Sequence, residues 1–364
     1  MPNINICFFS GDISRTGGTE RVTTIIANAL VARGFNVVIL SARGGNKASF
    51  FIEPEVHLYS LSMDQFSANL SDLKLINRLR KFIATKKIDY IVDIDVILSY
   101  YSILASLFSK TKVVSWEHFY YDINVGDFGQ RIRRTIARLF ALRFSFSIVV
   151  LTEKDRKKYL NKYHDQSKVV AINNPITPVG DKQSNLINKS VVAVGRLAHE
   201  KGFDLLIQAW SLVYTKRPDW VLRIVGSGVD YEILQNMAVR LGLEKCITFI
   251  ANTENVEKFY LDASIYVMTS RFEGFGMVLL EAKSYGLPIV SFDSDCGPGE
   301  IVKNNYDGYL VEFGDINALA IRMLELMDSE SKRIIFGKRA RLDNRFELQR
   351  IIRQWENIFL PNER

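Results

Sequence analysis

The sequence predicts an α/β protein built from two Rossmann-like domains, with a helix that closes the chain. Three observations support this fold class. The chain has 364 residues, which exceeds the length over which a single hydrophobic core usually keeps growing. Short β-branched runs alternate with helical patterns in both halves of the chain. Between the halves, residues 173–190 form a polar stretch with proline and glycine that interrupts both periodicities.

The first half contains five strand-sized apolar runs, with a helical pattern over residues 19–33 after the first of them. These runs cover residues 4–9, 36–40, 88–92, 112–115 and 147–151. Apolar runs of this length that alternate with helices are typical of βαβ units and therefore of a parallel sheet. We place the first domain at residues 1–175.

The second half repeats the same alternation. Its strand-sized runs cover residues 190–194, 220–225, 247–250, 265–269 and 289–292. We place the second domain at residues 176–345, and residues 346–364 contain apolar positions at helical spacing that predict a closing helix. In open α/β sheets ligands bind beyond the carboxyl ends of the strands, so two such domains are expected to hold a ligand in a cleft where they face each other.

The composition indicates a compact globular chain. Apolar residues make up 48% and charged residues 24%, close to globular averages. The longest apolar runs fall far short of the roughly 20 residues that span a bilayer, and the start of the chain does not resemble a secretory signal, so we expect a cytoplasmic protein. Three cysteines and four histidines are scattered without metal-ligand spacing, which predicts reduced thiols and no metal site.

The net charge of +7 is concentrated in the first half. Residues 1–178 hold 24 Lys and Arg against 15 Asp and Glu, which gives +9 and leaves −2 for the remainder. A basic half can attract nucleic acid, anionic lipid or a phosphorylated substrate. No basic patch is interleaved with aromatic residues, so nucleic acid is not an expected partner.

One helical pattern, residues 129–145, is both basic and amphipathic. Its apolar stripe and its arginines comprise Ile132, Ile136, Leu139 and Phe140, and Arg131, Arg133, Arg134, Arg138 and Arg143. Such a helix can lie on an anionic membrane surface. It can equally face the core while its arginines reach solvent, and the sequence leaves both interpretations open.

Two glycines precede the first helical pattern. Gly17 and Gly18 would let the backbone approach a ligand closely, and the free amides of a helix N-terminus attract phosphate. The spacing differs from GxGxxG, which disfavours an ordinary dinucleotide site. A simple turn is the common alternative for a glycine pair at this position.

Two cations follow the first strand of the second domain. Arg196 and Lys201 come directly after residues 190–194 and precede a helical pattern. Arginine offers a fork for phosphate oxygens and lysine adds a point charge, so the pair suits a diphosphate. A solvated basic loop is the alternative.

Two carboxylates, Glu273 and Glu281, stand eight residues apart around a Gly-Phe-Gly turn and the start of a helix. Eight helical residues advance about 12 Å, so the carboxylates could serve opposite ends of one elongated ligand. The amides of Phe275, Gly276 and Met277 would lie between them and face a phosphate. Glu281 lies in an apolar run, and a carboxylate in such surroundings needs a partner.

Together these motifs resemble the family 4 glycosyltransferases of the two-Rossmann GT-B fold, over nearly the whole chain. The family pattern of a glutamate, seven residues and a second glutamate is matched by Glu273 and Glu281. The remaining matches, in chain order, are Gly17 and Gly18, Asn174 and Pro175, Arg196 and Lys201 in "VGRLAHEKG", and the glycine pair Gly226 and Gly228.

The resemblance implies a role for each residue. Glu281 would bind the ribose hydroxyls of the donor and Glu273 a hydroxyl of its sugar, while His118 would lie against the same sugar. Arg196, Lys201 and the backbone at Gly18 would bind the diphosphate, and Gly226 would belong to the donor-binding loops. The donor would be a nucleotide-diphosphate sugar, with uridine as the favoured base, bound by the second domain.

The resemblance also implies a retaining hexosyltransferase that needs neither a separate cofactor nor a metal. Its acceptor would be a lipid-linked sugar or an oligosaccharide, bound by the first domain, during synthesis of O-antigen, capsule or exopolysaccharide. The lipid-linked acceptor favours the membrane interpretation of residues 129–145.

The main alternative is a nucleotide-sugar epimerase of the same fold, which is not expected to carry the paired glutamates with Arg196 and Lys201. The chain also contains two Asp-x-Asp strings of the kind that bind metal in another glycosyltransferase fold. They are Asp93-Ile94-Asp95 and Asp293-Ser294-Asp295. We interpret both as ordinary strand-end or loop residues.

Overall fold

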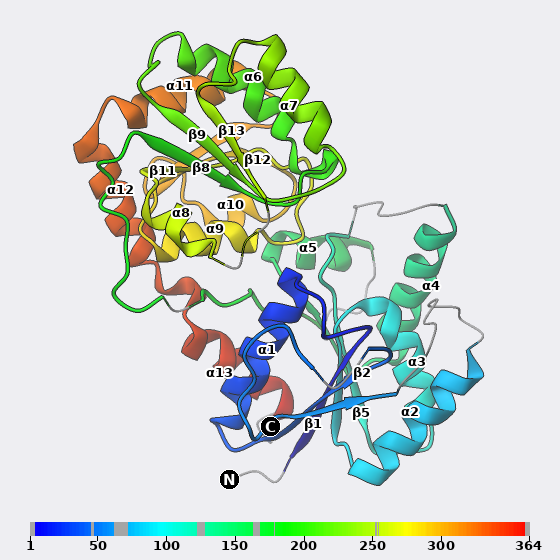
Figure 1. Cartoon of the computed structure of the whole chain (residues 1–364). Helices are drawn as coiled ribbons and strands as arrows, with labels where there is room; N and C mark the ends of the chain where they lie inside the picture. Colours follow the sequence, from blue (N-terminus) through cyan, green and yellow to red (C-terminus); the bar gives the residue numbers. More distant parts are fainter. Residues whose placement is uncertain are drawn as a thin grey trace. The chain divides into compact units, whose positions relative to one another are not determined.

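The computed structural model describes residues 4–44, 47–61, 72–121, 128–162, 168–177, 179–251, 253 and 255–360. The chain divides into two compact units (Figure 1). Unit 1 comprises Met1–Pro175 together with Leu348–Arg364, and unit 2 comprises Ile176–Glu347. The last segment of the chain therefore belongs to the first unit.

Unit 1 contains a seven-stranded parallel sheet with the order β3-β2-β1-β4-β5-β6-β7. Its strands are β1 (Asn5–Ser10), β2 (Asn36–Ser41), β3 (His57–Ser60), β4 (Tyr90–Asp93), β5 (Lys112–Trp116), β6 (Ser147–Val150) and β7 (Val169–Ala171). In the central strand β1, Cys7 lies opposite Val38 of β2 and Ile91 of β4. The strand order reverses between β1 and β4, and the carboxyl ends of such strands are where ligands bind in open sheets.

Helices cover both faces of this sheet (Figure 1). They are α1 (Gly18–Val31), α2 (Leu73–Lys86), α3 (Val96–Ser106), α4 (Phe128–Phe144), α5 (Glu153–Lys162) and α13 (Leu348–Phe359). Because successive side chains of a strand point to opposite faces, β1 buries residues on both. Cys7 and Phe9 pack in the core with α2 and α3, whereas the ring of Phe8 lies 6.4 Å from that of Trp355 of α13.

The closing helix predicted from the sequence is α13. A short 3-10 turn, Asn344–Phe346, precedes it. Trp355 is fully buried, with its ring 4.8 Å from Trp116 of β5, and the ring of Phe359 lies 5.1 Å from Tyr90 of β4. The helix thus completes the core of unit 1.

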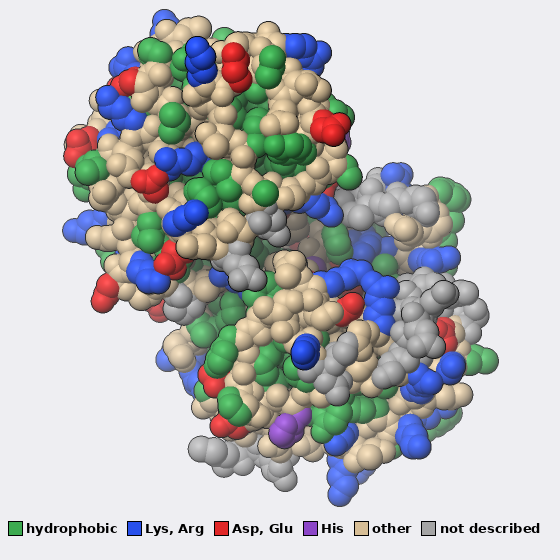
Figure 2. Space-filling model, in the orientation of Figure 1, with side chains coloured by type: hydrophobic (Ala, Val, Ile, Leu, Met, Phe, Trp, Pro, Cys, Tyr) green, Lys and Arg blue, Asp and Glu red, His purple; other side chains and the backbone are tan. Residues whose placement is uncertain are grey.

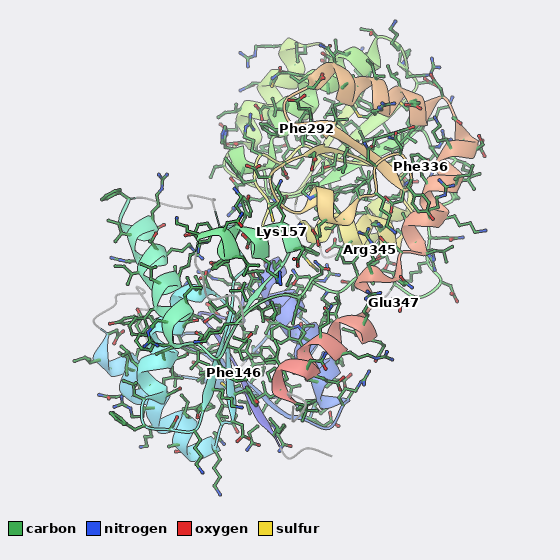
Figure 3. All side chains as sticks on the ribbon, turned by 180° about the vertical axis from the view of Figure 1, so that it is seen from behind. Phe146, Lys157, Phe292, Phe336, Arg345 and Glu347 are labelled. Atoms are coloured by element: carbon green, nitrogen blue, oxygen red, sulfur yellow. The ribbon has the colours of Figure 1, made fainter. Side chains whose placement is uncertain are left out.

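Unit 2 contains a six-stranded parallel sheet with the order β10-β9-β8-β11-β12-β13. Its strands are β8 (Ser190–Val194), β9 (Val221–Val225), β10 (Ile247–Ile250), β11 (Ile265–Met268), β12 (Ile289–Asp293) and β13 (Gly308–Glu312). Its α-helices are α6 (Phe203–Tyr214), α7 (Tyr231–Arg240), α8 (Glu257–Leu261), α9 (Met277–Ser284), α10 (Pro298–Ile301), α11 (Ile316–Met327) and α12 (Glu330–Arg341). Phe292 of β12 and Phe336 of α12 belong to its core (Figure 3). Two parallel sheets and a closing helix confirm the predicted fold class.

The polar stretch that follows Pro175 is fastened to unit 2. The Arg341 guanidinium donates to the carbonyls of Gly180 and Lys182 at 2.8 and 2.6 Å, and Arg333 Nε donates to the carbonyl of Leu186 at 3.0 Å. Both arginines come from α12, so this helix holds the chain where it enters β8. In the described part of the chain, every helix is too short or too polar to span a bilayer.

Candidate functional site

The carboxyl ends of β8 and β11 bring two predicted residues of unit 2 into contact. After β8 the chain makes a 3-10 turn, His199–Lys201, from which Lys201 Nζ donates to Glu273 Oε1 at 2.7 Å. Ser270 Oγ donates to the same oxygen, also at 2.7 Å. The Glu273 side chain is only 9% exposed, so a cation and a hydroxyl fix this carboxylate in place.

An arginine that was not predicted from the sequence, Arg271, joins the loop after β11 to the segment after β8. The Arg271 guanidinium binds both oxygens of Asp204 at 2.8 and 2.7 Å and also donates to the carbonyl of His199 at 2.9 Å. Its hydrogen bonds hold the pKa of Asp204 below the usual value. A Cβ on Gly202 would lie 2.2 Å from the carbonyl oxygen of Thr269, so only glycine allows the loops to approach this closely.

Arg196 lies on the same edge but makes a different contact. It follows β8, its side chain is 70% exposed, and its guanidinium forms an ion pair with Glu200. An exposed ion pair contributes roughly 0 to 1 kcal/mol. The arginine can therefore exchange Glu200 for an anionic ligand at little cost.

The glycine pair after β9 has a steric explanation. A Cβ on Gly226 would lie 1.9 Å from the carbonyl oxygen of Gly195, and a Cβ on Gly228 would lie 2.1 Å from that of Leu197. The loop after β9 therefore presses against the backbone that carries Arg196. Replacement of either glycine would move the strand-end loops apart.

Glu281 has the partner that its apolar surroundings require. It lies in α9, is 9% exposed, and accepts a hydrogen bond from the Tyr260 hydroxyl at Oε2, at 2.8 Å. The ring of Tyr260, from α8, stacks on Tyr285 at 5.2 Å. The sequence predicts that Glu281 has a partner but does not identify it as Tyr260, which lies 21 residues away in another helix.

The path between Glu273 and Glu281 differs from the one expected. Gly276 adopts φ 96° and caps α9, which begins at Met277, so the eight residues are not one helical stretch. A left-handed residue cannot continue an α-helix, and Glu273 therefore lies in the preceding loop. Burial, followed by the charges of Glu281 and Glu273, raises the pKa of Tyr266 of β11, which shows that both carboxylates lie near this strand.

Phe275 can contribute to a ligand site only through its backbone. Its side chain is 2% exposed, and its ring lies 6.0 Å from that of Phe346. A Cβ on Gly297 would lie 2.2 Å from the carbonyl oxygen of Phe275. The loop after β12 thus supports the turn that leads into α9.

In unit 1, the predicted glycines start α1. Gly17 is the N-cap residue and Gly18 the first residue of the helix. A Cβ on Gly17 would lie 2.4 Å from Glu20 Oε2, so a carboxylate of the same helix faces its N-terminus. Burial raises the pKa of Glu20, while backbone hydrogen bonds lower it. A phosphate at this end of the helix would have to displace Glu20.

His118 follows β5 and is buried. It is 8% exposed, its ring lies 4.4 Å from that of Trp116, and among the described residues its Nε2 has no hydrogen-bond partner. Burial lowers its pKa to about 4, with smaller effects from Asp95 and Arg134. The imidazole is therefore neutral near pH 7 and can donate to or accept from an uncharged hydroxyl.

The basic helix α4 is oriented opposite to the core-facing interpretation of its sequence. Arg134 and Arg138 are buried, whereas the apolar residues Ile132, Ile136 and Leu139 are 44, 39 and 49% exposed. The interpretation of a core-facing apolar stripe with arginines in solvent is wrong. The physical reason is that two carboxylates at strand ends, Asp95 and Glu117, attract the arginines inward.

The first Asp-x-Asp string also belongs to unit 1. Asp95 accepts from the amide of Ile97 at 3.0 Å and so caps α3, while Asp93 is fully buried and accepts from the Ser102 hydroxyl. Burial raises the pKa of Asp93 to about 8. Within the described part of the chain, no group of three or more His, Cys, Asp or Glu side chains could hold a metal ion. All three cysteines are free and buried.

Two parallel α/β units and a strand-end Glu-x7-Glu pattern in the second unit define the class of GT-B glycosyltransferases. Residues 16–179 match "Glycosyltransferase Family 4", and residues 181–343 match "Glycosyl transferases group 1". The chain belongs to the family 4 glycosyltransferases, a family of retaining enzymes, and this confirms the resemblance seen in the sequence.

Two relatives and one solved structure match this chain over nearly their whole length. An uncharacterized glycosyltransferase of Haemophilus influenzae is 32% identical over 355 residues, which cover 97% of this chain and 99% of the relative. The amylovoran biosynthesis glycosyltransferase AmsD of Erwinia amylovora is 28% identical, over 95% of this chain and 97% of the relative. The crystal structure of Anabaena HepE in complex with UDP shares the fold, with a TM-score of 0.84 at 19% identity over 98% of this chain and all of that one.

Proposed function

We propose that the protein transfers a hexose or N-acetylhexosamine from a UDP-sugar to a glycan or lipid-linked acceptor in surface-polysaccharide synthesis. The observation that carries this proposal is the Lys201–Glu273 pair, with Glu281 eight residues further on, at the strand ends of unit 2. The name of AmsD refers to amylovoran biosynthesis, and HepE was solved with UDP, which supports this donor and acceptor class.

Unit 2 is proposed to bind the donor. Glu281, oriented by Tyr260, would accept hydrogen bonds from the ribose hydroxyls, and Glu273 would accept one from a sugar hydroxyl. Rupture of the sugar–phosphate bond places negative charge on the departing diphosphate, and Lys201 and Arg196 would stabilise this charge without a metal. In a retaining front-face transfer a phosphate oxygen takes the acceptor proton, so no protein nucleophile is assigned.

Unit 1 is proposed to bind the acceptor and to complete the donor contacts. Its amides at Gly17 and Gly18 would contact phosphate once Glu20 has moved aside, and the neutral ring of His118 would contact the donor sugar. A neutral imidazole suits this role because the sugar hydroxyls carry no charge.

The exposed side of α4 is proposed to bind the inner face of an anionic membrane. Phe128, Ile132 and Ile136 follow each other at helical spacing and are 78, 44 and 39% exposed, and Arg131 and Arg143 of the same helix are exposed as well. Figure 2 shows hydrophobic and basic side chains next to each other over this helix. Sedimentation with phosphatidylglycerol vesicles should be lost in Ile136→Asp and kept in Ile321→Asp, a change at a 60% exposed residue of unit 2. If the parent protein does not bind such vesicles at low salt, this surface is not a membrane site.

The activity is tested by incubating the protein with UDP-, GDP-, ADP- and dTDP-sugars, each without acceptor. Release of free UDP from a UDP-sugar, faster than without protein, is the expected result. Recovery of a changed sugar still attached to its nucleotide would instead identify an epimerase. No reaction with any donor, together with no binding of UDP, would contradict the proposal.

A further inference from the structure

The segment that carries His118 is held by two arginines from one helix. Arg134 Nη1 donates to Glu117 Oε1 at 2.9 Å, and Arg138 Nε donates to Glu117 Oε2 at 2.8 Å. The Glu117 side chain is fully buried, and those of Arg134 and Arg138 are 9 and 7% exposed. Both oxygens of the carboxylate next to His118 are thus engaged by α4.

The same arginines contact the residues that follow His118. The Arg134 guanidinium lies 4.4 Å from the centre of the Phe119 ring. Arg138 Nη1 donates to the carbonyl of Tyr121 at 2.7 Å, and the Arg138 guanidinium lies 4.7 Å from the centre of the Tyr121 ring. These contacts fix the backbone on both sides of His118.

Arg134 also joins two neighbouring strand ends. It donates to both oxygens of Asp95 at 3.1 and 3.0 Å, and Asp95 follows β4 whereas Glu117 follows β5, its neighbour in the sheet. Only a planar guanidinium can satisfy two carboxylates in this forked way. The Tyr159 hydroxyl adds a further donor to Glu117 at 3.3 Å.

A network of this kind is an unfavourable way to achieve packing alone. Each buried ion loses most of its favourable hydration, and well-packed apolar residues often replace a buried ion pair without loss of stability. What an apolar cluster lacks is direction, because dispersion and hydrophobic contacts have no preferred geometry. The network therefore specifies a position for the segment Glu117–Tyr121.

We propose that Arg134 and Arg138 are positioning residues that act through Glu117 to hold His118 in place for the donor sugar. This inference rests on the proposed function of His118. The imidazole needs such support because its Nε2 is buried without a partner among the described residues, so no protein hydrogen bond orients that end of the ring. A displacement of about 1 Å in a reacting or contacting group can cost on the order of 100-fold in rate.

The test compares Arg134→Met with Arg133→Met. Arg133 is exposed and precedes Arg134 on the same helix, so it controls for loss of a charge from α4. The measurements are nucleotide release from the donor without acceptor and the NMR signal of the His118 ring, assigned with His118→Gln. The nearby aromatic ring of Trp116 changes the chemical shift of the His118 ring, and this shift therefore reports the position of His118.

We expect Arg134→Met to lower kcat about 10- to 100-fold and to leave the donor KM within about threefold. The His118 signal should move toward those of exposed histidines, and Arg133→Met should change neither property. Arg134→Lys should recover only part of the activity, because one ammonium cannot bridge Glu117 and Asp95 as the guanidinium does.

An unchanged His118 signal and a normal kcat in folded Arg134→Met would overturn the proposal. If that variant does not fold, Glu117→Gln keeps the shape of the side chain and removes its charge, and it must show the same loss for the proposal to stand. A parent protein without activity on any donor would reject the proposed function, while the NMR signal would still test the positioning.

Discussion

The replacement of Asp93 by asparagine gives a quantitative prediction. Asp93 ends β4, is fully buried, and accepts a hydrogen bond from the Ser102 hydroxyl. Burial raises its pKa from 3.8 to about 8. Near pH 7 this carboxyl is therefore protonated in the folded protein and ionised in the unfolded chain, so folding takes up a proton.

The sign and magnitude follow from this difference. A raised folded pKa contributes stability that is complete below the unfolded value of 3.8 and is lost as the pH rises through about 8. At pH 7 about 4 kcal/mol of this stability has been lost. The reason is that pH 7 lies about three units above the unfolded pKa of 3.8, and each unit corresponds to about 1.4 kcal/mol. Asparagine has similar shape and does not ionise. After allowance of about 1 kcal/mol for a weakened hydrogen bond, Asp93→Asn should be more stable by about 2 to 4 kcal/mol at pH 7.

Thermal unfolding between pH 4.5 and pH 8 measures this effect. The difference between Asp93→Asn and the parent should be small at pH 4.5 and grow steadily toward pH 8. Asp181→Asn, at an exposed position, should follow the parent at every pH. An Asp93→Asn variant that is less stable at pH 7, with an unchanged pH profile, would show that Asp93 is ionised in the folded protein.

Three further predictions concern the proposed donor site. Glu281→Ala should weaken UDP binding in calorimetry, because each hydrogen bond to a charged group contributes about 1.5 to 3 kcal/mol; an unchanged Kd in a folded variant would remove Glu281 from the site. Tyr260→Phe keeps the ring stacking and loses the hydroxyl that orients Glu281, so its Kd should rise less than that of Glu281→Ala; a larger rise would mean that Tyr260 contacts the nucleotide directly. Gly226→Ala should lower the unfolding temperature more than Gly242→Ala, because a Cβ on Gly226 would lie 1.9 Å from a backbone oxygen whereas one on Gly242 meets nothing within 4 Å; equal losses would show that the loop after β9 can move.

Much of the site in unit 2 could be predicted because parallel strands bring their carboxyl ends to one edge. Lys201 and Glu273 are 72 residues apart in sequence, yet each follows a strand of the same sheet, and the structure joins them in an ion pair. The ion pair between Arg271 and Asp204 could not be predicted because the two residues belong to no known motif. The one indication in the sequence is that Arg271 lies two residues before the predicted site residue Glu273.

The inward arginines of α4 could not be predicted from periodicity. Helical spacing identifies which residues share a face but not which face turns inward, and the usual rule places the apolar stripe inside. Here the buried carboxylate of Glu117 reverses that rule. Glu117 in "VVSWEHFYY" is, like Glu281, a carboxylate in an apolar run that needs a partner, and the arginines of the next helix supply one.

The central claim is that Lys201, together with Arg196, stabilises the departing diphosphate without a metal. Loss of one preorganised donor to a developing negative charge typically costs on the order of 100- to 1000-fold in turnover. The most direct measurement is turnover at saturating donor, with and without EDTA, for the parent and for Lys201→Ala. We predict that the parent keeps its activity in EDTA and that Lys201→Ala loses turnover in that range. Parent activity that EDTA abolishes and magnesium or manganese restores, or near-normal turnover of Lys201→Ala, would contradict the claim.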